Sequence, residues 1–213
     1  MAPKQPTPPE SLPVLSGYDF KKRYHNAKFF KLTNKAELHH GLKYKKGLII
    51  DPILFNDAPG CSPGGIYFCC KKNIIQWLDY SWSGSGYMQY YRPVEIPDDA
   101  TVCVDHNKFK ADKIVLGQRK CIWSDYDLCY DIVGYRGELL GRVNPKIQTH
   151  AMCERAIQNY SPALLYVRKN LQTEKLIIYA IKRGFPVDRL DKKDVTPKIL
   201  EVADTYVRKN KIY

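Results

Sequence analysis

Apolar residues in the first half of the chain come in short runs that favour β-strands. Between residues 27 and 123, alternating or β-branched runs are separated by Pro, Gly and Asp, which are typical of turns. One segment, NIIQWLDY (73–80), has apolar residues at helical spacing, with Asn73 as its candidate N-cap. We therefore expect residues 27–123 to form a small β-rich α+β domain. The predicted strands are KFFKL (28–32), GLIIDPIL (47–54), GGIYFCC (64–70), MQYYRPVEI (88–96), ATVCVD (100–105) and ADKIVLG (111–117).

The second half has a period of 24 residues, counted from Ser124. A fixed period of this kind is typical of stacked repeats, in which each unit buries an apolar stripe against its neighbour. Each block is expected to form a helix after an N-cap residue, Thr149 or Thr173, followed by a shorter helical turn. Residues 124–213 are therefore predicted to be an α-helical, solenoid-like domain capped by a truncated fourth block. The matching columns include Cys129, Cys153 and Ile177; Ile132, Ala156 and Ala180; and Val133, Ile157 and Ile181.

The first 26 residues carry neither pattern. Residues 1–16 are rich in proline and polar residues, so we expect them to be extended and flexible when free. Residues 17–26 mix aromatic and basic side chains. We interpret residues 1–26 as a docking arm rather than as part of the core. Its candidate contact residues are Tyr18, Phe20, Lys21, Lys22, Arg23 and Tyr24.

Charge restricts the kind of partner. The formal net charge is +12, which favours polyanions or acidic protein surfaces. The basic residues are spread out: residues 124–213 hold 16 Lys+Arg and 11 Asp+Glu, and the rest of the chain holds 18 and 11. This spread is typical of a solvated basic surface, and nucleic-acid binding through it is the alternative. No apolar run reaches about 18 residues, so no membrane span is predicted, and the N-terminus lacks the apolar stretch of a signal peptide.

The cysteines and histidines predict no metal site. Seven cysteines are present, and none forms a CxxC pair. The histidines other than His39 and His40 stand apart in the sequence. We expect small buried cysteines in a reducing compartment rather than a disulfide framework, and we predict neither a metal nor a cofactor.

One set of residues resembles the cleft of ADP-ribosyl-transferring enzymes. Such clefts use a His-Gly pair near a strand end, a tyrosine that stacks on nicotinamide, and a later glutamate that polarises a ribose hydroxyl. Here LHHG offers His39 or His40, GGIYF offers Tyr67, and the acid would be Glu95 or Glu138. This alternative makes His40, Tyr67 and Glu95 the catalytic residues.

A structural interpretation competes for the same stretch. In APGCSPGGIYFCC (58–70), the Pro and Gly residues form a constrained turn that leads into a strand. Ile66, Phe68 and Cys70 then share one face of that strand, and Tyr67 lies on the other with Cys69. In this interpretation no catalytic residue is present.

An ordered series of motifs resembles a domain common in giant DNA viruses of amoebae, where it often precedes ankyrin-type or other helical repeats. The resemblance covers roughly residues 27–120, and the blocks from residue 124 are similar to short helical repeats of those viruses but lack the ankyrin TPLH signature. It implies a viral origin and a two-part architecture, and it carries over no catalytic residue. The motifs are FFKLTNKAELHHGLKYKKGLIIDPILF, PGGIYFC, PVEIPDDATV and FKADKIVLG.

These observations favour a non-enzymatic viral protein-interaction protein. Its most concrete form is a minor capsid-associated component of the virion, assembled in the host cytoplasm, with other viral proteins and above all capsid proteins as partners. A host-targeting adaptor and the ADP-ribosyltransferase-like enzyme are the alternatives.

Overall fold

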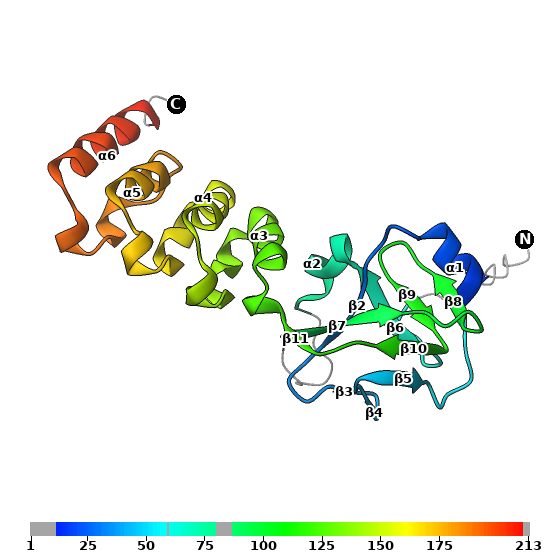
Figure 1. The fold of residues 1–213 in the computed structure, drawn as a ribbon. Helices are drawn as coiled ribbons and strands as arrows, with labels where there is room; N and C mark the ends of the chain where they lie inside the picture. The colour runs from blue at the N-terminus through cyan, green and yellow to red at the C-terminus, as the bar shows by residue number, and fades with distance from the viewer. Residues whose placement is uncertain (1–11, 59, 80–86, 211–213) are drawn as a thin grey trace, which may run out of the picture. The chain divides into compact units, whose positions relative to one another are not determined.

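The chain folds into two compact units, an antiparallel β-sheet unit and a series of short helices (Figure 1). A computed structural model describes residues 12–58, 60–79 and 87–210. The first unit extends to Cys121 and the second begins at Ile122. The α+β class predicted from the sequence is confirmed.

Nine strands of the described part of the first unit form one antiparallel sheet in the order β1-β8-β9-β6-β2-β7-β10-β5, with β11 also paired to β7. Several of these strands have only two or three residues, which is too short for alternation to be visible in the sequence. They are β1 (Val14–Ser16), β2 (Phe29–Thr33), β5 (Gly47–Ile50), β6 (Ile66–Cys70), β7 (Tyr90–Glu95), β8 (Thr101–Val104), β9 (Phe109–Ala111), β10 (Lys113–Leu116) and β11 (Lys120–Cys121).

A separate two-stranded hairpin joins β3 (Leu38–His39) to β4 (Leu42–Lys43). Its two loop residues, His40 and Gly41, have φ values of 49° and 81°. Positive φ at both central residues is the geometry of the tightest hairpin turns, and the second of them is a glycine, which adopts it without strain. This turn accounts for the His-Gly pair in LHHG.

The sheet encloses one aromatic and aliphatic core. Val102 of β8 and Ile114 of β10 belong to the same buried cluster although their strands lie near opposite ends of the strand order, so the sheet curls around the cluster. Ile66 and Phe68 point into it from β6, with Cys70 packed against it. This confirms the predicted assignment of faces on β6.

The docking-arm interpretation is wrong for the part of residues 1–26 that the structure describes, because Phe20 is fully buried. Strand β1 pairs with β8, and helix α1 (Gly17–Arg23) follows it, capped by the Ser16 hydroxyl. The Phe20 ring lies 5.0 Å from that of Phe29 and 5.1 Å from that of Phe109. In the sequence Phe20 lies next to basic residues, and this pattern is typical of an exposed segment rather than of a core residue. Residues 1–11 of the predicted arm lie outside the described residues.

The remaining candidate contact residues of the arm surround Phe20 on α1 and just after it. Tyr18 is exposed, and the Lys21 ammonium lies 2.6 Å from the Asp98 carboxylate. Tyr24 packs its ring 5.3 Å from that of Phe109, and the Arg23 guanidinium lies over Tyr24. Lys22 is exposed. These residues therefore belong to a helix packed on the core.

The first unit also contains η1 (Lys71–Asn73) and α2 (Ile74–Trp77), which form the predicted helical segment. Asn73 does not cap α2 with its side chain and donates instead to the Asn107 carbonyl at 2.9 Å.

The second unit repeats a pattern of one α-helix and two short 3-10 helices. Helices α3, α4 and α5 begin at residues 126, 150 and 174, so the 24-residue period predicted from the sequence is present, and α6 begins one residue early, at 197. Figure 1 shows these four helices following one another in chain order. The elements are η2 (Ile122–Ser124), α3 (Tyr126–Tyr135), η3 (Gly137–Arg142), η4 (Pro145–Ile147), α4 (His150–Asn159), η5 (Ser161–Tyr166), η6 (Lys169–Leu171), α5 (Glu174–Ile181), η7 (Val187–Arg189), η8 (Lys192–Asp194) and α6 (Pro197–Asn210).

Each repeat begins with an N-cap at the same column. Thr149 and Thr173 accept hydrogen bonds from the third backbone N–H of their helices, at 3.3 Å, as the sequence predicted. Asp125 and Thr196 do the same for α3 and α6. Such a cap stabilises a helix by about 1 kcal/mol.

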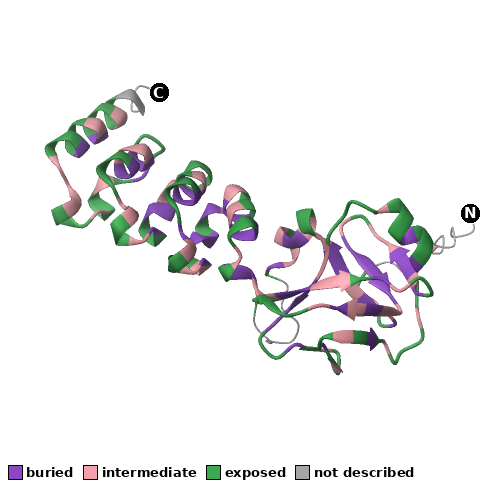
Figure 2. Ribbon diagram, in the orientation of Figure 1, coloured by how far each residue is buried: buried purple, intermediate pink, exposed green. Residues whose placement is uncertain are grey.

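Apolar columns of successive repeats form the core of this unit. Cys129, Cys153 and Ile177 are at most 2% exposed, and Figure 2 shows the buried faces of neighbouring helices turned toward one another. A glycine allows the first two repeats to approach closely, because a Cβ on Gly137 would lie 2.2 Å from the Ala156 carbonyl oxygen.

Candidate functional site

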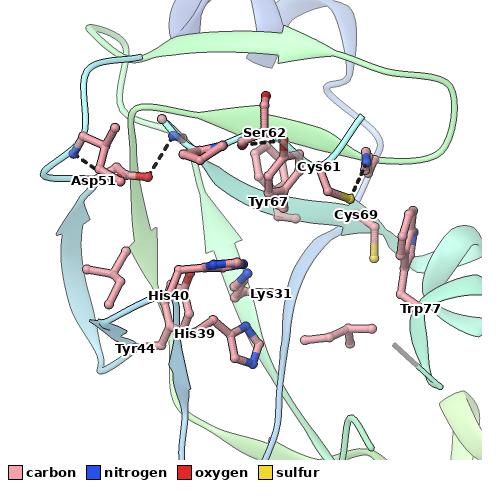
Figure 3. A pocket seen from close by; sticks show the side chains of 18 of the residues that line it. Lys31, His39, His40, Tyr44, Asp51, Cys61, Ser62, Tyr67, Cys69 and Trp77 are labelled. Atoms are coloured by element: carbon pink, nitrogen blue, oxygen red, sulfur yellow. Dashed lines mark hydrogen bonds between the residues drawn. The ribbon is translucent and has the colours of Figure 1, made fainter. Parts of the chain in front are cut away.

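A cavity of about 380 Å³ lies where strands β2 and β6 separate (Figure 3). The register between the two strands covers Phe29 with Cys70 and Phe30 with Cys69, and from Lys31 onward β2 continues along β7. The β3–β4 hairpin and the turn before β6 supply further lining residues. Nine of the described residues that line it have aromatic or aliphatic side chains: Phe30, Leu32, Leu42, Tyr44, Ile53, Tyr67, Phe68, Trp77 and Met88.

Tyr67 lines this cavity with its ring, while its hydroxyl is tied to the preceding turn. The hydroxyl oxygen lies 3.0 Å from the Gly60 carbonyl and 2.9 Å from the Ser62 carbonyl. The ring is therefore held in a fixed orientation at the edge of the cavity, on the face of β6 opposite to Phe68.

His39 and His40 line the same cavity from the β3–β4 hairpin. The His39 Nε2 atom is buried and has no hydrogen-bond partner among the described residues. Burial, and then the neighbouring charges of Lys31 and His40, lower the pKa of His39 to about 4. The imidazole is therefore neutral near pH 7.

The structure brings together two of the three residues of the ADP-ribosyl-transfer alternative. His40 and Tyr67 both line the cavity, but Glu95 is an exposed residue of β7 and does not. Glu138 belongs to η3 in the other unit, where its carboxylate lies 2.9 Å from Arg136 Nε. Among the described residues, no glutamate lines the cavity to supply the acid that this chemistry needs.

Asp51 is the one acidic residue among the described residues that line the cavity. Its two carboxylate oxygens accept hydrogen bonds from the backbone N–H groups of Ile53 at 2.9 Å and Gly65 at 2.8 Å. Asp51 thus fixes the turn that leads into β6.

Lys31 points from the core-facing side of β2 into the cavity. It lies two residues after Phe29, which packs against the core, and it is 6% exposed. Its ammonium lies 4.5 Å from the centre of the Tyr44 ring and has no hydrogen bond or ion pair within the described ranges. Burial lowers the pKa of Lys31 to about 8.

A second lysine of the cavity, Lys108, is fully engaged. Its ammonium donates to the Gly60 carbonyl at 3.0 Å and to Cys61 Sγ at 3.2 Å, and lies 3.8 Å from the Asp105 carboxylate. It also lies over the ring of Tyr67. Lys108 therefore has a structural role that Lys31 lacks.

In residues 12–58, 60–79 and 87–210, no group of three or more His, Cys, Asp or Glu side chains is placed to hold a metal ion. Burial raises the pKa of the Cys69 thiol to about 12, so this cysteine is neither a thiolate ligand nor a counter-ion for Lys31 near pH 7.

Two candidate contact residues of the predicted arm border a second hollow. Arg23 and Tyr24 line it together with Lys28, Lys71 and Lys72. The lining of this hollow includes four basic side chains, Arg23, Lys28, Lys71 and Lys72, together with the acidic Asp105.

One repeat exposes three large side chains at its 3-10 helix η5, here called the repeat edge and defined as Tyr160, Leu165 and Tyr166. Each is between 40% and 46% exposed. The two tyrosines lie against glycines of the preceding repeat, since a Cβ on Gly137 would lie 2.9 Å from Tyr160 Cβ and one on Gly141 would lie 3.0 Å from the Tyr166 ring.

Lys31 was not singled out from the sequence, although a signal for it was present. In FFKLT the alternation places Lys31 on the same face as Phe29, and lysine is rarely buried without a partner. Tyr44 and Asp51 gave no such signal, because their roles depend on contacts with distant strands.

Proteins of a giant virus of amoebae are similar to part of this chain. It is 37% identical over 93 residues to "Uncharacterized protein R869" of Acanthamoeba polyphaga mimivirus, covering 43% of this chain and 65% of that protein. It is 34% identical to "Putative ankyrin repeat protein R868" of the same virus, covering 50% of this chain and 53% of that protein. Against "Putative ankyrin repeat protein R896", the identity is 34% over 42% of this chain and 27% of that protein.

The chain thus spans less than two thirds of the length of each of these relatives. No family profile matches it, and no solved structure is significantly similar. Over two fifths to one half of its length, the chain is similar to proteins of an amoeba-infecting giant virus.

Proposed function

We propose that this chain is a non-enzymatic protein-interaction protein of a giant amoeba virus, in which the helical repeats contact the partner. The observation that carries the proposal is the stack of 24-residue repeats with its exposed repeat edge. Stacked repeats characteristically use an extended surface to bind other proteins. The ankyrin-repeat descriptions of two similar viral proteins support the same class of function.

The side chains of the repeat edge suit a protein partner. Tyrosine is enriched at the centre of protein–protein interfaces because it combines a large apolar ring with a hydroxyl. Tyr160 and Tyr166 are held against glycines of the preceding repeat, so little side-chain entropy is lost when a partner covers them. The net charge of +12 favours a partner with an acidic surface.

In the form we favour, the protein is a minor capsid-associated component of the virion, assembled in the host cytoplasm, and its partners are other viral proteins. Quantitative mass spectrometry of purified particles tests this form. We expect the protein at a fixed ratio to the capsid proteins across independent preparations. Its absence from particles, with abundant protein in infected cells, would instead favour the host-targeting adaptor.

Substitutions in the repeat edge test whether this surface binds the partner. A Tyr160→Ser, Tyr166→Ser variant should lose at least tenfold in recovery of its viral partner from infected cells. Tyr135 is also exposed but lies outside the edge, so Tyr135→Ser is the matched control and should keep its partner. If both variants recover the same amount of the partner, the repeat edge is not part of the binding surface.

None of the helices in the described ranges has the length and apolar character needed to cross a membrane. Nucleic acid is a second candidate partner, favoured by the basic hollow that contains Arg23, Lys28 and Lys71. Binding there should weaken steeply with added salt, because phosphate contacts release counter-ions.

A further inference from the structure

The cavity of the β-sheet unit contains a lysine whose position needs an explanation. Lysine is almost never buried without a partner, because an ammonium loses its hydration on burial. Lys31 is 6% exposed and, among the described residues, makes no hydrogen bond or ion pair. Its contact with the Tyr44 ring replaces only part of the lost hydration. The ammonium therefore lies in the cavity without a counter-charge among the described residues.

No acidic side chain of the described residues lies within ion-pair distance of the Lys31 ammonium. Asp51 is the acidic residue of the described lining, and both its oxygens already accept backbone hydrogen bonds. The Cys69 thiol is neutral near pH 7. A partner for the Lys31 ammonium therefore has to come from outside the described residues.

A second buried group points to the same need. The Nε2 atom of His39 lines the cavity region without a hydrogen-bond partner among the described residues. In a neutral imidazole this nitrogen donates a hydrogen bond when it carries the proton. Figure 3 shows Lys31, His39 and Tyr44 near one another, so two unpartnered nitrogens lie in one part of an otherwise apolar cavity.

We propose that this cavity binds a small carboxylate with an aromatic or aliphatic body, whose carboxylate pairs with Lys31 and His39 and whose body lies among the aromatic and aliphatic side chains that line the cavity. The cavity volume of about 380 Å³ is in the range of small-molecule sites, which are mainly apolar with a few converging polar groups. One ammonium and one imidazole N–H match the two oxygens of a carboxylate.

The size and charge of the site favour this ligand class over others. A single free ammonium is too little to hold a di- or triphosphate, whose sites use several cations or a helix N-terminus. The second lysine of the cavity, Lys108, is occupied by Gly60, Cys61 and Asp105. This binding site is separate from the repeat edge and does not depend on the function proposed for the repeats.

The test compares two probes of the same shape on the full chain by isothermal titration calorimetry. The probes are 2-naphthoate, which carries the carboxylate, and its neutral amide, 2-naphthamide. We expect the wild-type protein to bind naphthoate at least tenfold more tightly than naphthamide. Equal affinity for the two probes, or binding of neither, would overturn the proposal without any variant.

Two variants then assign the preference to Lys31. Lys31→Met keeps the length of the side chain, removes the charge, and should reduce naphthoate affinity at least tenfold, to that of the amide. Lys46→Met removes the same charge from an exposed position and should bind naphthoate as the wild type does.

Lys31→Met is expected to unfold at an equal or higher temperature than the wild type, because a buried unpaired ammonium is replaced by an apolar side chain. Thermal unfolding by circular dichroism therefore separates loss of binding from loss of folding. Unchanged naphthoate affinity in a folded Lys31→Met protein would contradict the assignment. If this variant fails to fold, the proposal is decided by the ratio of the wild-type affinities for naphthoate and naphthamide.

Discussion

At the residue scale, the ion pair between Glu37 and Arg92 is the most consequential polar contact of the sheet unit. Arg92 Nε and one terminal nitrogen lie 2.8 Å and 3.0 Å from the two Glu37 carboxylate oxygens, and both side chains are less than 10% exposed. Glu37 also adopts a positive φ of 52°, which the surrounding bonds maintain. Removing one partner of a buried pair leaves the other charge without compensation.

Glu37→Ala should therefore lower the free energy of unfolding by about 3–5 kcal/mol. The matched control is Asp99→Ala, because the Asp99 carboxylate lies 2.7 Å from the Lys113 ammonium but is exposed. Water screens such a pair, so this variant should show no measurable loss of free energy in urea unfolding. A loss as small for Glu37→Ala as for the control would mean that the buried pair is not needed for stability.

His39 gives the sheet unit a pH dependence in the acid range. Burial, with Lys31 and His40 as further causes, lowers its pKa from 6.5 to about 4 in the folded protein. Between those values the unfolded chain binds a proton that the folded chain does not, so stability falls as the pH falls from 6.5 toward 4. The His39 contribution should be about 1–2 kcal/mol after allowance for partial exposure.

The comparison of wild type with His39→Gln isolates this contribution from that of the carboxylates. Between pH 7 and pH 4.5 the wild type should lose about 1–2 kcal/mol more than the variant in urea unfolding. His150 is exposed, and His150→Gln should follow the wild type at both pH values. If all three proteins lose the same free energy of unfolding between pH 7 and pH 4.5, His39 is not the source of the pH dependence.

At the element scale, the contact between the first two repeats depends on a glycine. The Gly137 N–H donates to the Asn159 side-chain oxygen at 2.8 Å, and there is no space for a Cβ beside the Ala156 carbonyl. Gly137→Ala should cost about 1–3 kcal/mol, the usual range for overpacking. A Cβ at Gly141 would lie 3.0 Å from the Tyr166 ring, a milder overlap than the 2.2 Å to a backbone oxygen at Gly137, so Gly141→Ala should cost less. Urea unfolding followed by circular dichroism measures the loss of free energy of unfolding in both variants. Equal losses would show that η3 can move enough to make room for a Cβ at Gly137.

The elements differ in how far the sequence determines them. The repeats were predictable because local signals agree: Thr149 and Thr173 cap their helices, and the apolar columns recur every 24 residues. The role of Phe20 was not predictable, because its partners Phe68 and Phe109 are distant in sequence and its neighbours are charged. Short strands such as β9 leave too few residues for a period to appear.

The candidate site was predictable only in part for the same reason. The HHG and GGIYF motifs led to His40 and Tyr67, and both line the cavity. Glu95 was chosen by its order in the sequence, and the register of β7 places it outside the cavity. Lys31 becomes conspicuous only when the sheet, the hairpin and the absence of an acidic partner among the described residues are seen together.

At the scale of the whole repeat unit, stability should depend on position along the stack. Counted from the start of its helix, Leu200 of α6 is in the same position as Cys129, Cys153 and Ile177, but it is 51% exposed, whereas Ile177 is 2% exposed. In a stack each repeat buries its column against the next one, and no repeat follows α6 in the described residues.

Truncation at the same helix position should therefore have unequal effects. Ile177→Ala should lower the free energy of unfolding by about 2–4 kcal/mol, because it leaves a cavity between two repeats. Leu200→Ala should cost less than about 1 kcal/mol, since half of its surface is already in water. Urea unfolding followed by far-ultraviolet circular dichroism compares them. Equal costs would mean that Leu200 is covered in solution, and this position would then be the place to look for the covering partner.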